Sequence, residues 1–187
     1  MSFDVFFASS NRNKYNEAKK ILSDFGINLG FFKTTLEEIQ EESIKKIASR
    51  KVADAYRKCN KPIIVEDDGL FIDSLKGFPG PFSSYVFKTI GNSGILLLVQ
   101  TNRKAFFQSV IAYCDKKNGI VLFDAKVKGQ IAKKSQDVGW GYDPIFIPHG
   151  QSKTYAMLSN KNEISHRYMA LKKFSNWFVH RQKSNDQ

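Results

Sequence analysis

The most informative segment of the sequence is PIIVEDDGLFID, residues 62–73. Its first part, residues 63–65, is a short apolar run of the kind that forms a buried strand in an α/β sheet. The chain then places Glu66, Asp67 and Asp68 next to one another, directly before Gly69. Ligand crevices of α/β sheets lie at the carboxyl ends of the strands, so we expect these acids at that edge of the sheet.

Three adjacent carboxylates repel one another, and a divalent cation is one way to offset that repulsion. Magnesium prefers hard oxygen ligands and commonly bridges carboxylates and substrate phosphates, while a remaining carboxylate can orient or deprotonate water. Taken alone, two aspartates near a strand end form a solvated turn more often than a catalytic site. The rest of the chain has to decide between these two interpretations.

The sequence on both sides of this stretch predicts an α/β domain with a mixed sheet. Apolar runs predict strands, and apolar positions at helical spacing predict helices. The expected strands cover residues 3–8, 27–32, 63–65, 105–114, 120–128 and 142–148. A first helix is expected directly after residues 9–13, and four further helices should cover residues 44–56, 83–90, 92–100 and 165–178. Asn118 and Gly119 form the dipeptide that hairpin turns favour, so the strands on either side of it should form a long antiparallel hairpin. The polar tail from Arg181 should be frayed.

The composition is that of a globular chain with an excess of basic residues. Of the 187 residues, 42% are hydrophobic and 25% are charged, which fits one domain with a real core. The formal net charge of +11 favours polyanionic partners such as nucleotides, nucleic acid or pyrophosphate, although most lysine pairs should simply be solvated. No apolar run is long enough to cross a bilayer, no targeting signal is visible, and Cys59 and Cys114 have no metal-ligand spacing. We expect a cytoplasmic protein with reduced thiols and no membrane association.

Several common catalytic motifs are absent from the sequence, which contains no GKS or GKT phosphate loop, GxGxxG, HExxH or GxSxG. The opening segment SSNRNK, residues 9–14, offers another kind of phosphate site. It lies between a predicted strand and a helix N-terminus, where backbone N–H groups and the helix dipole attract phosphate, and Lys14 adds a positive charge. Capping of the helix by Asn11 or Asn13 explains the same residues and is compatible with phosphate binding.

Two later segments carry residues suited to a purine base. VGWGYDPIFIPHG, residues 138–150, sets Trp140 and Tyr142 among glycines before Asp143, a pattern typical of an exposed aromatic platform on which a base stacks. In isolation, a core tryptophan beside a tight turn is the more common outcome. NKNEISHRYMALKKF, residues 160–174, combines positive charge with hydrogen-bond donors for a carbonyl at a predicted helix start, in Lys161, Ser165, His166 and Arg167.

In this order, the four segments resemble the inosine/xanthosine triphosphate pyrophosphatase family, which hydrolyses non-canonical purine nucleoside triphosphates to monophosphate and pyrophosphate. SSNRNK is similar to the family's (T/S)GNxxK loop, VEDDGL and GFPGPFSSY to its acidic and PGxxS segments, and GWGYDPIFIP with ISHR to its base-binding end. The match covers essentially the whole chain. It implies an α/β fold with a long twisted mixed sheet, flanking helices and two lobes around a central cleft, a homodimer, and Mg²⁺ as cofactor.

The resemblance also implies a role for each matching residue. Asp67 would be the catalytic residue that activates water, and Glu38, Asp67 and Glu66 would serve the metal, with Asp68 supporting the water. The residues implied to bind the triphosphate are Ser9, Asn11, Lys14 and Lys51. Trp140 would stack on the base and Asp143 would help to fix it. The other residues implied at the substrate are Gly141, Tyr142, Lys161, Ser165, His166 and Arg167, the last four at the purine edge.

Three positions depart from the family pattern. Ser10 stands where glycine is common, Trp140 where phenylalanine is usual, and Met157 where glutamate is frequent.

Two other functions fit parts of the sequence. A Maf-type nucleotide pyrophosphatase is opposed by the GWGYD and ISHR segments. A non-enzymatic nucleic-acid-binding module would leave the acidic cluster unexplained, because adjacent carboxylates repel a phosphate backbone. We therefore expect a nucleoside triphosphate as substrate and no stable nucleic-acid complex.

Overall fold

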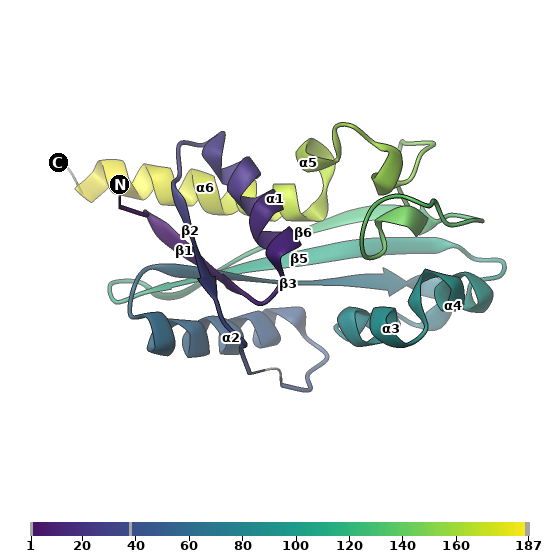
Figure 1. Ribbon diagram of the computed structural model, residues 1–187, viewed down its shortest axis with the longest axis horizontal. Coiled ribbons are helices and arrows are strands. Elements are labelled where there is room, and N and C mark those ends of the chain that lie inside the picture. Colours follow the sequence, from purple (N-terminus) through teal and green to yellow (C-terminus); the bar gives the residue numbers. More distant parts are fainter. Residues whose placement is uncertain (1, 38, 186–187) are drawn as a thin grey trace. The chain divides into compact units, whose positions relative to one another are not determined.

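The computed structural model describes residues 2–37 and 39–185, with side chains as far as residue 181 (Figure 1). Helices and strands alternate in its first third, and a long hairpin and a C-terminal helix follow. In chain order the elements are β1 (Val5–Ser9), α1 (Arg12–Ser23), β2 (Leu29–Lys33), α2 (Ile44–Cys59), β3 (Ile63–Ile72), η1 (Asp73–Leu75), β4 (Pro79–Gly80), α3 (Ser83–Thr89), α4 (Gly91–Leu98), β5 (Lys104–Asp115), β6 (Gly119–Ile131), η2 (Asp143–Ile145), β7 (Phe146–Pro148), η3 (Tyr155–Met157), α5 (Lys161–Ile164) and α6 (His166–Asn185), where η marks a 3₁₀ turn. Among the described residues, no helix combines the length and apolarity that a membrane crossing needs.

The strands form a mixed sheet in the order β2-β1-β3-β5-β6-β7, and β4 pairs with β3 outside this path. β1 pairs in parallel with both β2 and β3, as expected when helices connect successive strands. β4 and β7 pair antiparallel with β3 and β6. The predicted α/β class with a mixed sheet and flanking helices is confirmed.

The chain divides into two compact units, each with its own apolar core. Unit 1 takes the described residues of 1–67, 109–125 and 167–187, and unit 2 takes residues 68–108 and 126–166. β3, β5 and β6 each contribute residues to both units. The central cleft that the resemblance implies stays a prediction.

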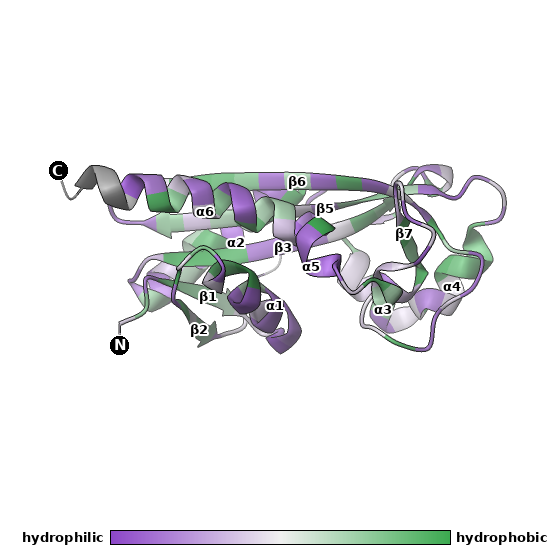
Figure 2. Cartoon of the chain, turned by 90° about the horizontal axis from the view of Figure 1, so that it is seen from above, coloured by the Kyte–Doolittle hydropathy of each residue, from purple (hydrophilic) through white to green (hydrophobic). Residues whose placement is uncertain are grey.

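In unit 1 helices cover both faces of the strands. Figure 1 shows α1 and α6 on one face and α2 on the other. α1 begins at the N-cap Asn11 and buries its apolar stripe, and α2 begins at Ser43, whose hydroxyl accepts a hydrogen bond from the backbone N–H of Lys46. The core between α1, α6 and the strands includes Val5, Phe7, Ile21, Leu22, Ile64, Ile111, Leu171 and Phe174. Figure 2 shows the alternation of polar and apolar residues along α6 that such one-sided burial requires.

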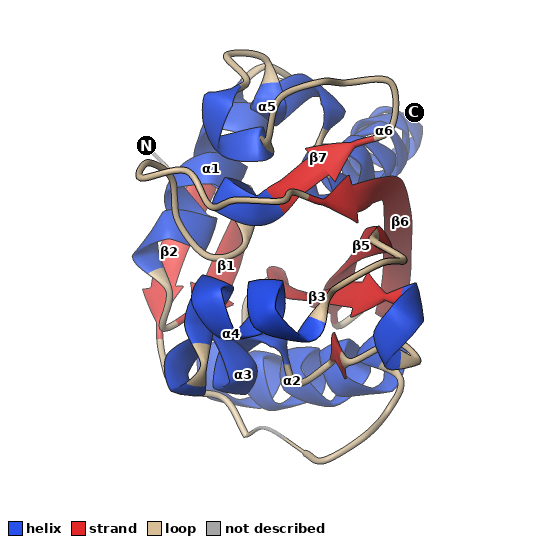
Figure 3. Ribbon diagram, turned by 90° about the vertical axis from the view of Figure 1, so that its right-hand side faces the viewer, coloured by secondary structure: helices blue, strands red, loops and turns tan. Residues whose placement is uncertain are grey.

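Unit 2 has a separate core built from the outer parts of the long strands and the segments that follow them. Its buried residues include Leu70, Ile72, Val86, Ile95, Phe107, Ile131, Ile145, Phe146 and Tyr155. α3 and α4 lie beside each other after the turn at 77–82 (Figure 3). Along the chain, the boundary between unit 1 and unit 2 falls within the acidic cluster of β3, between Asp67 and Asp68.

Three predicted elements differ from the structure. β3 does not end at the acids but runs on to Ile72, because Leu70 and Ile72 are buried in the core of unit 2 and extend the strand beyond them. The expected strand over 142–148 is shortened to Phe146–Pro148, since Asp143 and Pro144 form a 3₁₀ turn first. The tail expected to fray from Arg181 remains helical to Asn185, and the Arg181 guanidinium lies over the Trp177 ring, 5.2 Å from its centroid.

The hairpin turn between β5 and β6 is closed by one carboxylate. Asp115 accepts hydrogen bonds from the backbone N–H and the side-chain amide of Asn118 and from the Tyr113 hydroxyl, at 2.6, 2.7 and 2.7 Å. Partial burial of Asp115 opposes its ionisation, but these hydrogen bonds outweigh burial and lower its pKa. Gly119 completes the turn with φ 63°, a left-handed conformation that glycine adopts without strain.

We predict that Asp115→Ala lowers the free energy of unfolding by about 1–2 kcal/mol at neutral pH, because three donors lose their acceptor. A lowered folded pKa contributes stability that is present above the unfolded value of about 3.9 and is lost as pH falls through the folded pKa. The difference between wild type and variant in urea unfolding should therefore be constant above about pH 5 and shrink as pH falls from there through the lowered folded pKa of Asp115. Lys116→Ala, at an exposed position of the same turn, is the control, and a pH-independent difference for Asp115→Ala would contradict the prediction.

Candidate active site

The predicted phosphate loop is an ordered helix cap. The Ser9 hydroxyl accepts a hydrogen bond from the backbone N–H of Asn11 at 3.0 Å. The Asn11 side-chain oxygen in turn accepts from the backbone N–H groups of Asn13 and Lys14, at 2.9 and 3.4 Å. Residues 9–14 therefore cap α1 and remain compatible with phosphate binding, because the capped N-terminus carries the positive end of the α1 dipole and the Lys14 side chain. Because three N–H groups of the loop already have acceptors, an arriving phosphate would be attracted mainly by the dipole and the lysine charge.

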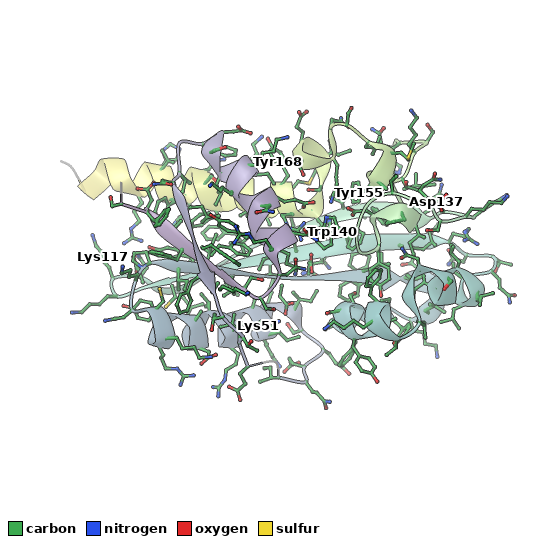
Figure 4. All side chains as sticks on the ribbon, viewed as in Figure 1. Lys51, Lys117, Asp137, Trp140, Tyr155 and Tyr168 are labelled. Atoms are coloured by element: carbon green, nitrogen blue, oxygen red, sulfur yellow. The ribbon has the colours of Figure 1, made fainter. Side chains whose placement is uncertain are left out.

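The second group in unit 1 is an ion pair between Asp67 on β3 and Lys51 on α2. The Lys51 Nζ lies 3.4 Å from an Asp67 carboxylate oxygen, and both side chains are largely buried. Figure 4 shows Lys51 on α2. The helix position of Lys51 explains the contact, because its neighbour Val52 and the residues Ala48 and Ala55 pack α2 against the sheet. Two residues that the sequence predicted separately are thus brought together.

Glu66 has a different set of partners. Its side chain is 0% exposed, and its carboxylate accepts hydrogen bonds from the Ser109 hydroxyl at 2.9 Å and from the Arg167 Nε at 2.7 and 2.9 Å. The Arg167 guanidinium, 2% exposed, also pairs with Glu17 on α1. A buried carboxylate is stable only when it is paired and hydrogen-bonded, and here one arginine compensates two acids.

These contacts place neighbouring acids on opposite faces of the sheet. Successive side chains of a strand point to opposite faces. Glu66 accordingly meets α6 and α1, whereas Asp67 meets α2, and these helices lie on different faces of unit 1 (Figure 1). Glu66 and Asp67, predicted as joint metal ligands, do not converge. Arg167, predicted at the purine edge, holds the Glu66 side of β3.

In unit 2, Lys161 contacts two of the other predicted base-binding residues, Trp140 and Asp143. The Lys161 Nζ pairs with the Asp143 carboxylate at 2.5 Å and lies over the Trp140 ring, 5.3 Å from its centroid. A lysine over the face of an indole is a cation–π contact. Trp140 is labelled in Figure 4. A base that stacks on the same face of Trp140 would compete with the Lys161 ammonium for that face, so the stacking surface and the ion pair are linked.

The residues next to Trp140 have structural tasks. Gly141 has φ 58°, which favours glycine, and its carbonyl accepts a hydrogen bond from the Asn92 amide at 3.1 Å. The Tyr142 hydroxyl donates to the Ser83 carbonyl at 2.9 Å, and burial raises the pKa of this phenol. Both residues therefore shape the loop that carries Trp140 and Asp143. Their predicted contact with substrate stays a prediction.

His166 is a buried ring with an unsatisfied nitrogen. The imidazole stacks on Phe107 at a centroid distance of 4.3 Å and an interplanar angle of 8°. Its Nε2 lies 3.8 Å from an Asp68 carboxylate oxygen, and its Nδ1 has no hydrogen-bond partner among the described residues. Ser165, which caps α5 and is almost wholly buried, precedes it. A buried polar atom without a protein partner costs stability unless a water molecule or a ligand binds it, so this nitrogen is available to either.

The residues for a metal ion are only partly described. Glu38 lies outside the described residues. Within the described chain, no three histidine, cysteine, aspartate or glutamate side chains form a group that could hold a metal ion. Magnesium often takes only one or two protein carboxylates and completes its shell with water and substrate phosphates. Among the described residues, Asp67 therefore fits an ion that arrives with a triphosphate and takes few protein ligands.

Four side chains in these groups were missed by the sequence analysis. They are Glu17, Ser109, Phe107 and Asn92, which contact Arg167, Glu66, His166 and Gly141 respectively. Glu17 follows Lys14 by three residues, a spacing that puts both on neighbouring positions of α1. The other three carry no local signal, because a serine or phenylalanine in a strand and an asparagine in a helix have many uses.

The chain is similar over nearly its whole length to known proteins. A family model described as the Ham1 family matches residues 5–177. A dITP/XTP pyrophosphatase of Methanopyrus kandleri is 45% identical over 179 residues, which cover 93% of this chain and 95% of that protein. One of Thermococcus kodakarensis is 42% identical over 176 residues, covering 91% and 95%. The solved structure of a HAM1 protein from Coxiella burnetii is similar with a TM-score of 0.81 at 27% identity, covering 96% of this chain and 100% of that chain.

We predict that Arg167→Ala lowers the free energy of unfolding by about 3–5 kcal/mol, because Glu66 would be left buried without a counter-charge. The measurement is urea unfolding followed by circular dichroism. Glu66→Gln combined with Arg167→Met should recover part of the loss, since it removes both the charge and its partner. Lys172→Ala, at an exposed position of α6, is the control. A loss from Arg167→Ala no larger than that of the control would show that the network does not stabilise unit 1.

Proposed function

Since the chain belongs to the Ham1 family, we propose that it hydrolyses non-canonical purine nucleoside triphosphates such as ITP, dITP and XTP to the nucleoside monophosphate and pyrophosphate. The relatives named as dITP/XTP pyrophosphatases, at 36–45% identity over nearly the whole chain, support this substrate class. Removal of such nucleotides would cleanse the nucleotide pool of bases that pair incorrectly.

The observation that carries the proposal is the ion pair of Asp67 and Lys51. A carboxylate on a buried strand can accept a proton from water, and a lysine 3.4 Å away offers positive charge to a phosphate. In the proposed reaction the water oxygen bonds to the α-phosphorus, the bond to the bridging oxygen of pyrophosphate breaks, and Asp67 takes the water proton. Lys51 and Lys14 offset negative charge on the phosphate oxygens.

The metal belongs to the proposal as Mg²⁺ that accompanies the substrate. Asp67 would hold it, with Glu38 as the second carboxylate that the resemblance implies. When bound, Mg²⁺ neutralises phosphate charge and polarises the phosphorus toward attack. Glu66 serves this site indirectly in the proposal, since its own carboxylate is engaged by Ser109 and Arg167.

The unit 2 group supports recognition of a purine that carries oxygen at position six. Trp140 offers a face for stacking, and Lys161 offers a donor beside it. The unpartnered Nδ1 of His166 offers one further polar contact in a buried position. Adenine presents an amino group at position six and would leave a donor unpaired, which is costly in a buried site.

We further propose a homodimer that works in the cytoplasm. Large apolar side chains on α3 and α4, among them Tyr85, Leu97 and Leu98, are 70%, 79% and 51% exposed, which supports association with a second copy. Both cysteines are free thiols, as a reducing compartment would keep them. Sedimentation velocity measures the assembly state directly.

We predict that Asp67→Asn reduces kcat by about two to four orders of magnitude while substrate binding remains measurable, because the amide keeps the shape but cannot accept the proton. The assay incubates inosine triphosphate with the protein and magnesium and separates the products. Asp73→Asn, an exposed acid just after β3, is the control. Wild-type turnover by Asp67→Asn at saturating magnesium would remove Asp67 from the chemistry. Orthophosphate and a diphosphate as products would refute cleavage at the α-phosphorus.

We predict that Trp140→Ala and Lys161→Ala have different effects on selectivity. Loss of stacking should lower kcat/KM for inosine and adenosine triphosphates by a similar factor, about 10- to 100-fold, because every purine has a face that stacks. Loss of the Lys161 donor should lower kcat/KM for inosine triphosphate more than for adenosine triphosphate. Val138→Ala, an exposed residue of the Trp140 loop, is the control. Equal losses for both substrates in Lys161→Ala would show that this lysine does not read position six.

A further inference from the structure

Unit 2 contains a cavity of about 350 Å³ that shares no residue with the candidate active site. The loop after β6, strand β7 and the segment leading into η3 form its walls, and Lys133, Lys134, Lys153, Ser152, Thr154 and Met157 are among the residues that line it. Small-molecule sites span roughly 300–1,000 Å³, so the cavity has the size of a small ligand. We propose that this cavity is a second binding site, for a small phosphate-bearing anion.

The charge of the cavity is the main observation. Lys133, Lys134 and Lys153 all line it, and none of the three forms an ion pair within the described part of the chain. Asp137 lies in the same loop as the first two (Figure 4) but neither lines the cavity nor pairs with a lysine. Three like charges around one hollow repel one another, and an anion with several oxygens is the partner that offsets this repulsion.

A second cavity in the same chain shows basic residues that are paired with acids of the protein itself. It belongs to unit 1, measures about 520 Å³ and is also lined by three basic residues, Lys45, Lys46 and Arg50. Each of these pairs with an acid of the chain, in Asp124, Glu41 and Glu37, at 3.1, 3.2 and 3.7 Å. The three basic residues of this second cavity are thus compensated within the chain, whereas those of the unit 2 cavity have no acid partner among the described residues.

The remaining walls narrow the class of ligand. Thr154 is 3% exposed, and its hydroxyl has no hydrogen-bond partner among the described residues, so the cavity wall holds an unsatisfied polar group. A phosphate oxygen, directly or through a water molecule, would give that hydroxyl an acceptor. Ala132, Ile147 and Met157 supply apolar surface beside the lysines. Inorganic pyrophosphate and a nucleoside monophosphate share the phosphate chemistry, and the latter would also use the apolar wall.

Methionine supplies a local probe of occupancy. The sequence has three methionines, of which Met157 lines the cavity and Met169 lies on α6 in unit 1. The full chain, labelled with ¹³C at the methionine methyl groups, is titrated at low salt with inorganic pyrophosphate, with inosine monophosphate and with a single-stranded oligonucleotide. Met157→Leu assigns the signal. The Met157 shift reports this cavity, whereas ligand binding at the candidate active site is followed separately by turnover.

We expect a saturable Met157 shift with pyrophosphate, with inosine monophosphate, or with both, at a Kd of about 1 mM or below. Lys133→Gln, Lys134→Gln and Lys153→Gln together should weaken it at least about tenfold, because three charge-assisted contacts are lost. Lys45→Gln, Lys46→Gln and Arg50→Gln together are the matched control and should leave it unchanged. Lys153→Gln alone should give a smaller loss and guards against misfolding of the triple variant.

Three results would overturn the proposal. The first is the absence of a saturable Met157 shift up to about 10 mM of either small anion, and the second is a shift that persists unweakened in the triple lysine variant of the cavity. The third is a Met157 response to the oligonucleotide at a lower concentration than to both small anions. The last would make the cavity part of a nucleic-acid surface. The cavity residues take no part in the proposed hydrolysis, so turnover by the cavity variant tests the proposed function separately.

Discussion

The pleat of β3 at Glu66 and Asp67 is the constraint on which the arrangement of unit 1 depends. Neighbouring residues of a strand face opposite sides of a sheet, so two adjacent acids cannot share one environment. Glu66 enters the core on the side of α1 and α6, and Asp67 meets Lys51 on the side of α2. Glu66 is therefore engaged in holding the fold, whereas Asp67 is the acid to which we assign the proposed chemistry.

A buried carboxylate such as Glu66 needs a cation that pairs with it and donates hydrogen bonds. Arg167 is that cation, with a guanidinium whose donors reach both Glu66 and Glu17, so α6, β3 and α1 are tied by one side chain. Lysine at this position would offer a single point charge instead of a planar fork. Arg167 belongs to unit 1, whereas its neighbour His166 belongs to unit 2 and stacks on Phe107 there. Consecutive residues of ISHR thus serve two different cores.

Lysines are used in two ways in this chain. Lys51 and Lys161 lie in largely buried ion pairs beside residues of the proposed reaction, where a phosphate or a base could exchange for the carboxylate partner. Lys133, Lys134 and Lys153 are exposed and surround a hollow. The net charge of +11 does not distinguish these cases, because a sum over the chain contains no information on pairing.

The α/β class, the parallel opening and the hairpin could be predicted from the sequence, because apolar periodicity, turn dipeptides and helix caps are local signals. Asp67, Trp140 and Lys161 were predicted as site residues from segments that are continuous in the chain, whereas Lys51 came only from the family resemblance. Only the tertiary structure decided that β3 continues beyond its acids, that Glu66 binds Ser109 and Arg167, and that Lys161 links Trp140 to Asp143. These contacts join residues up to 101 positions apart, and which face a side chain meets depends on the elements packed there, which no local pattern records.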